Sequence, residues 1–171
     1  MPLTPDPFRL LLPPLIDWIE RTLADHAMGA RPVASLGFRR LRQYFSEEQL
    51  AVAKVAAVEH VPVPPLTALG APGFEEFETM QAAGITYLDT FFVGQRYAAD
   101  ESLHFHELIH IVQWRLLGHE RFLAAYAAGL QSYGYRNSPL ENMAYDAQGR
   151  FDRDPVPFDA EEFVAEGIVR L

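Results

Sequence analysis

Two histidines and a glutamate stand together in one strongly apolar segment, "HELIHIVQW", which runs from His106 to Trp114. His106 and His110 are four positions apart, so a helix places both imidazole rings on one face, one turn from each other. At that spacing two ring nitrogens can bind one Zn²⁺ at about 2.0–2.1 Å. Glu107 follows the first histidine and can reach a water molecule on such a metal as a general base. The pattern predicts a hydrolytic zinc site.

A catalytic zinc normally has three protein ligands, and the chain after His110 offers His119, Glu120 and Glu141. A longer form of the motif needs a third histidine six residues after His110, where this chain has Leu116. Glu120 follows a predicted helix end too closely to return to the metal. The segment "HERFLAAYAAGLQSYGYRNSP" is long enough for a helix and a turn that bring a further helix back antiparallel. Glu141 on that helix is therefore expected to complete a His₂Glu set.

Two other interpretations of these residues remain open. Ser138 followed three positions later by Glu141 matches a capping box, in which Glu141 would bond the N-cap amide and bind no metal. The histidines could also be ordinary residues of a helix that holds no metal, either satisfied in the core or partly exposed.

A hydrolase also needs a donor for the oxyanion that forms at the substrate carbonyl. Tyr133, Tyr135 and Tyr145 are candidates, with Arg136 behind them. Tyr145 is preferred because it lies one turn after Glu141 on the same helix face. A packing role is the alternative for each tyrosine.

Metal-bound histidines usually donate their second ring N–H to an acceptor. Gln113 could line the site or orient a ligand, and Asp146 could accept such a hydrogen bond. Asp89 could do so too, although a solvated aspartate at a strand end is the simpler interpretation. The remaining histidines are expected to be structural or exposed: His26, His60, His104 and His119.

These residues require elements that position them. We expect helices over residues 13–27 (with Pro13 and Pro14 in the first turn), 47–53, 101–117, 119–134, 139–151 and 159–171. Ser46 and Gln49 predict a capping box for the second of these. Strands are expected over residues 54–63, near a sheet edge, and 84–94. The predicted class is α+β, a mainly helical domain with a small sheet whose edge strand "GITYLDTFFV" runs beside the HExxH helix.

The ordered segments "YLDTFFV", "FHELIHIVQWRLLG", "FLAAYAAGL" and "GYRNSPLENMAYDAQ" resemble zincin-like metallopeptidase domains of the gluzincin type. Within that group the chain is most similar to small bacterial domains of largely uncharacterised function, over roughly residues 50–150. The resemblance implies that His106 and His110 are zinc ligands, Glu107 the catalytic base and Glu141 the third ligand. At 171 residues the chain is expected to form a single domain, in which an N-terminal helical extension over residues 1–45 and a tail over 151–171 flank the zincin-like core over 46–150 that the resemblance implies.

The composition narrows the function classes. The 171 residues carry a net charge of −9 and no cysteine, which excludes disulfides and thiolate metal sites and leaves no broad basic face for nucleic acid. No apolar run approaches the roughly 18 residues of a membrane span, so no membrane partner and a cytoplasmic location are expected. The predicted function is a zinc metallopeptidase acting on a peptide or protein substrate. The alternative is a non-enzymatic binding or regulatory module that retains a zincin scaffold. The oligomeric state is not predicted.

Overall fold

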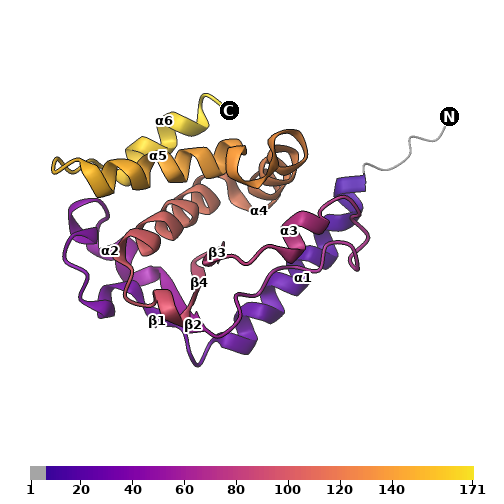
Figure 1. Cartoon of the computed structure of the whole chain (residues 1–171), viewed down its shortest axis with the longest axis horizontal. Coiled ribbons are helices and arrows are strands. Elements are labelled where there is room, and N and C mark those ends of the chain that lie inside the picture. The colour runs from indigo at the N-terminus through magenta and orange to yellow at the C-terminus, as the bar shows by residue number, and fades with distance from the viewer. Residues whose placement is uncertain (1–6) are drawn as a thin grey trace.

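In the computed structural model, which describes residues 7–171, helices surround a small four-stranded sheet (Figure 1). The helices are α1 (Pro7–His26), α2 (Glu47–Val52), α3 (Glu75–Thr79), α4 (Glu101–Asn137), α5 (Pro139–Arg153) and α6 (Ala160–Ile168). The strands are β1 (Arg31–Pro32), β2 (Lys54–Val58), β3 (Gly84–Tyr87) and β4 (Thr90–Gly94). Short 3₁₀ turns span Val33–Leu36, Leu41–Gln43 and Gln95–Tyr97. This arrangement confirms the predicted helix-dominated α+β class.

The sheet has the order β1-β2-β4-β3 and mixes two kinds of pairing. β2 runs parallel to β4, and β1 and β3 pair antiparallel with β2 and β4. The strand predicted near an edge over residues 54–63 ends at Val58 and lies between two others, with only the two-residue β1 outside it. The predicted position near an edge is thus confirmed, whereas the predicted length was wrong because the strand stops before the prolines.

The single strand predicted over residues 84–94 is a hairpin. The chain reverses at Leu88 and Asp89, and Leu88 has a positive φ of 59°. Leucine rarely adopts this left-handed conformation, so nothing in the sequence marked Leu88 as a turn residue. The β-branched and aromatic residues on either side therefore predicted one continuous strand. The outer strand, β3, forms the edge of the sheet next to α4.

α4 begins as predicted and is interrupted twice. The side chain of Asp100 caps its N-terminus by accepting a hydrogen bond of 3.1 Å from the Leu103 N–H. Gly118 and Gly134 have φ values of 73° and 72°, which break the helix into three stretches. Residues 101–117 therefore form one continuous helix that ends at the predicted glycine.

α1 begins six residues earlier than predicted, and Pro13 and Pro14 lie inside it. Leu11, Leu15 and Ile19 are spaced by four and are 7%, 5% and 2% exposed. Burial of this stripe, which starts before the prolines, outweighs the local loss of two backbone N–H donors. The capping box of α2 is formed as predicted, since Ser46 and Gln49 bond each other reciprocally.

Two groups of buried apolar side chains meet at the first stretch of α4. One includes Phe105 and Ile109 and continues onto α5 and α6. The other includes Trp114 and continues onto α1, α3 and β3. Figure 1 shows α5 lying along α4 and α1 lying near α3, and α1 also contacts α4. This helix is buried on almost every side, which explains its apolar sequence. No helix within residues 7–171 has the length and apolar character needed to cross a membrane.

Candidate metal centre

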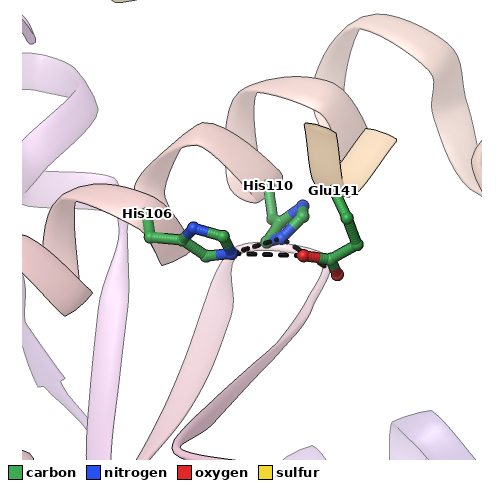
Figure 2. A group of neighbouring side chains, drawn as sticks. All are labelled: His106, His110 and Glu141. Atoms are coloured by element: carbon green, nitrogen blue, oxygen red, sulfur yellow. Dashed lines mark hydrogen bonds and ion pairs between the residues drawn. The ribbon is translucent and has the colours of Figure 1, made fainter. Parts of the chain in front are cut away.

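Three side chains converge between α4 and α5. His106 and His110 project from one face of α4 toward Glu141 on α5 (Figure 2). The two Nε2 atoms are 3.1 Å apart, and Glu141 places Oε2 3.3 Å from His106 Nε2 and Oε1 3.4 Å from His110 Nε2. Donors bound tetrahedrally to zinc at about 2.05 Å lie about 3.3 Å from one another. The group is buried, and its spacing can hold a metal ion.

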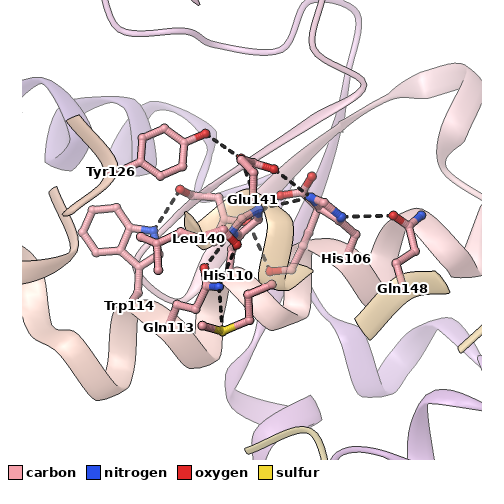
Figure 3. A network of polar contacts seen from close by, with 11 residues as sticks. His106, His110, Gln113, Trp114, Tyr126, Leu140, Glu141 and Gln148 are labelled. Atoms are coloured by element: carbon pink, nitrogen blue, oxygen red, sulfur yellow. Dashed lines mark hydrogen bonds and ion pairs between the residues drawn. The ribbon is translucent and has the colours of Figure 1, made fainter. Parts of the chain in front are cut away.

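The Gln113 amide fixes which nitrogen of His110 carries a proton. His110 Nδ1 lies 2.8 Å from Gln113 Oε1, and Gln113 Nε2 donates to the Leu140 carbonyl at 3.0 Å (Figure 3). Because the Gln113 amide nitrogen donates to a carbonyl, the amide oxygen must face the His110 ring. That oxygen then accepts a hydrogen bond from Nδ1–H. Nε2 of a neutral His110 then presents its lone pair toward Glu141. The predicted orienting role of Gln113 agrees with this contact.

A second amide does the same for His106. Its Nδ1 lies 3.0 Å from Gln148 Oε1, and Gln148 Nε2 donates to Ser102 Oγ at 3.0 Å. Ser102 in turn donates to Asp152 Oδ2 at 3.0 Å, so its hydroxyl oxygen must accept from Gln148. The chain from Asp152 through Ser102 and Gln148 therefore leaves His106 with its lone pair on Nε2.

When both histidines are neutral, these contacts bring three acceptors together without a donor among them. Two Nε2 lone pairs and a carboxylate oxygen repel one another unless a cation lies between them. Glu141 Oε1 accepts a hydrogen bond of 2.6 Å from Tyr126, whereas Oε2 is buried and makes no hydrogen bond to any part of residues 7–171. Glu141 is only 1% exposed, and a buried oxygen without a hydrogen-bond partner is suited to bind a metal ion.

The pKa values of His110 and Glu141 in the metal-free cluster also indicate that it needs a positive charge. Burial alone would lower the pKa of His110, but the contacts with Glu141 outweigh it and raise that pKa to about 9. For Glu141, burial opposes ionisation, yet the two histidines hold its pKa well below the usual range. A proton on His110 thus supplies the cation that the cluster needs near neutral pH. A divalent metal would displace that proton.

Glu107 lies against β3. Its Oε2 accepts a hydrogen bond of 2.6 Å from Thr86 Oγ1. A Cβ atom at Gly84 would lie only 2.6 Å from Glu107 Oε1, so any larger residue there would displace the carboxylate from this position. Burial raises the pKa of Glu107, partly opposed by His106 and His110. Glu107 lines the same cavity as His110 and Glu141 and is only 3% exposed, which suits a proton acceptor.

The capping interpretation of Glu141 is wrong. Ser138 is the N-cap of α5, but its hydroxyl makes no cap hydrogen bond and its N–H donates to the Tyr135 carbonyl at 3.3 Å. Glu141 instead points to the histidines, with its two oxygens 3.3 and 3.4 Å from their Nε2 atoms.

The two aspartates predicted as acceptors do not contact the histidine rings. Asp146 is exposed, on the outer side of α5, and Gln148 takes the place predicted for it. Two residues along a helix rotate a side chain by about 200°, which separates these two positions. Asp89 is a half-exposed strand-end residue, 3.7 Å from Lys54.

The predicted tyrosines lie at different distances from the centre. Tyr145 packs on His106 with ring centroids 4.5 Å apart, and the Arg136 guanidinium lies 3.5 Å from the centre of its ring. Tyr135 lines the cavity and hydrogen-bonds Tyr145, and burial raises the pKa of both hydroxyls. Tyr133 is 61% exposed and does not line that cavity.

The remaining predicted positions are structural or exposed. His104 is 1% exposed, and its Nδ1 lies 2.8 Å from the Asp100 carbonyl in the preceding turn. His26 likewise approaches a carbonyl of its own helix, and His60, His119 and Glu120 are exposed.

Three functional contacts were missed from the sequence: those of Gln148, Tyr126 and Thr86. Gln148 lies seven residues after Glu141, a spacing that returns to one helix face, so helical periodicity could have found it. Tyr126 and Thr86 carry no such signal, because tertiary packing alone brings them to the site.

No family model matches the chain, and no curated protein or solved structure is significantly similar to it. Inferences about function therefore depend on the geometry of the site.

Proposed function

We propose that the protein is a zinc-dependent hydrolase of the zincin-like type, with peptides as substrates. The observation that carries the proposal is the convergence of His106 Nε2, His110 Nε2 and the buried Glu141 carboxylate, whose nearest oxygens lie 3.3 and 3.4 Å from the two nitrogens. Imidazole and carboxylate donors without a thiolate suit zinc and leave one position open. A zinc ion held there would polarise a substrate carbonyl and make a water molecule a strong nucleophile.

Glu107 is the general base in this proposal. Its carboxylate lines the cavity with the metal donors, and Thr86 holds one oxygen while Gly84 leaves room for the other. Glu107 removes a proton from the attacking water and returns it to the leaving amine. Burial raises the pKa of Glu107, which makes its carboxylate a stronger base than an exposed glutamate.

Tyr145 donates to the oxyanion. The Tyr135 hydroxyl donates a hydrogen bond to the Tyr145 oxygen, and this contact adds to the burial that raises the pKa of Tyr135 while it opposes the rise for Tyr145. The proton of Tyr145 therefore stays available for the substrate, and its ring already lies against His106. Preorganised donors of this kind stabilise the charge that develops at the carbonyl oxygen.

The variant Glu107→Gln tests the proposal. Zinc-loaded wild-type protein is expected to cleave members of an unbiased peptide library, and the variant should lose about 10²–10⁴-fold in rate because an amide takes no proton from water. Its zinc content should be unchanged, since Glu107 is not among the three converging donors. Cleavage at equal rates by both proteins would contradict the role of Glu107. A zinc-loaded wild type that cleaves nothing would instead favour the binding module.

A further inference from the structure

A cavity of about 70 Å³ lies beside the metal centre, and its walls are mostly apolar. Glu107, His110 and Glu141 contribute to its lining. The rest of the wall comes from α1, from α3 and the segment before it, from β3, and from α4 on both sides of Gly118. One continuous space therefore joins the proposed reacting groups to an apolar chamber.

The chemistry of the chamber favours an apolar occupant. A buried water needs about 10–15 Å³ and two to four polar partners, so the chamber has room for water but offers few partners along its apolar walls. Two hydroxyl groups near its polar end already donate hydrogen bonds to carboxylates, Thr86 to Glu107 and Tyr126 to Glu141. Enclosed spaces with such walls remain dry and accept aliphatic or aromatic groups.

α1 supplies one wall of this chamber. Leu11, Leu15 and Ile19 all line it and are at most 7% exposed. The side chains of Arg21 and Thr22 donate their hydrogen bonds to carbonyl groups of α1 itself. Apolar contact thus holds this face of the helix against the chamber, so the size of these side chains sets the free space.

We infer that the chamber binds an apolar side chain of the substrate, next to the bond that is cleaved, and that α1 limits the size of that side chain. The inference rests on the proposed function, because it takes the converging donors as the reaction centre. An acidic side chain would lose its hydration there and face the carboxylates of Glu107 and Glu141. The substrate class is therefore a peptide with an aliphatic or aromatic residue at the cleavage point.

Straight-chain hydroxamic acids test the position of the chamber relative to the metal. Their head group chelates zinc, and their chains, from acetyl to octanoyl, reach different depths. Affinity for the zinc-loaded protein should rise about fourfold with each added methylene until the chamber is filled, and then level off. Equal affinity across the series would overturn the inference while leaving the metal site intact.

Leu11→Ala tests the contribution of α1, with Leu10→Ala as the matched control. Leu11 is 7% exposed and lines the chamber, whereas Leu10 is 63% exposed. The smaller side chain at position 11 should move the levelling point to a longer acyl chain, and the control should match wild type. Both variants are first compared with wild type by thermal unfolding. A levelling point unchanged in folded Leu11→Ala would overturn the role of α1.

A further measurement requires neither metal nor hydrolysis. Trp114 lines the chamber, and Trp18 is the other of the two tryptophans in the chain. In a Trp18→Phe background, titration of the metal-free protein with primary alcohols should change Trp114 fluorescence, at lower concentration for longer chains. No response at any chain length would overturn the chamber as an apolar site. A response without zinc binding would retain the chamber and reject the proposed function.

Discussion

Two glutamine amides define the metal centre at the scale of the residue. The side-chain amides of Gln113 and Gln148 each donate an N–H to another acceptor. Each amide therefore presents its oxygen to a histidine ring. Both rings then direct Nε2 lone pairs to the same point. A neutral amide holds the ring without adding charge, so Glu141 is the one carboxylate among the three candidate metal donors.

Gln148→Met should weaken zinc binding about 10–100-fold, because His106 would lose the acceptor that fixes its tautomer and orientation. Asp146→Asn is the matched control, since this exposed residue lies two positions away on α5. Competition with a chromophoric chelator measures both affinities. Equal affinity of Gln148→Met and wild type would show that the amide contact does not organise the site.

The stability of the metal-free protein should depend on pH through His110 and Glu141. The pKa of His110 is raised from 6.5 to about 9 in the folded state, so its stabilisation is complete below pH 6.5 and is lost as the pH rises through about 9. The pKa of Glu141 is lowered, so its contribution exists above pH 4.5 and is lost as the pH falls further.

The midpoint of thermal unfolding should accordingly fall between pH 6.5 and 9 by more in metal-free wild type than in His110→Gln. His60→Gln is the control, because this histidine is exposed and should leave the wild-type profile unchanged. A steeper fall in His110→Gln than in wild type would contradict a proton shared by the buried pair.

At the scale of the element, Gly118 and Gly134 divide α4 into its three stretches. Gly118 combines a φ of 73° with a ψ of 169°, a region that side-chain-bearing residues avoid. The break ends the stretch that carries both histidines and redirects the chain toward the turn before α5. Both the helix and its end were predictable, since helical periodicity and a terminal glycine are local signals.

Gly118→Ala should lower the free energy of unfolding by about 1–3 kcal/mol through backbone strain alone. An added Cβ there meets no atom within 4 Å, so packing contributes nothing to the loss. Gly29→Ala is a suitable control, because its Cβ would have an ordinary contact of 3.7 Å and no positive φ. Urea unfolding measures both variants. A Gly118→Ala protein as stable as wild type would contradict the strained break.

At the scale of the whole molecule, local and long-range features of the sequence differ in how far they could be predicted. The α+β class, the helix that carries His106 and His110, and the inward position of Glu141 follow from periodicity and spacing. The hairpin at Leu88 and the contact from Tyr126 depend on turn strain and tertiary packing, which no local pattern encodes. The contribution of α1 to the chamber wall could not be predicted from a local pattern either, because chain segments about 90 residues apart meet there.

Zinc stoichiometry tests the central claim most directly, that His106, His110 and Glu141 hold one metal ion. Elemental analysis after dialysis against zinc should find about one zinc per chain in wild type. His106→Ala and His110→Ala should lose it, and Glu141→Ala should bind it more weakly. His119→Ala, an exposed histidine on α4, should keep the wild-type content. A folded wild type without zinc, or full zinc content in His106→Ala and His110→Ala, would contradict the account.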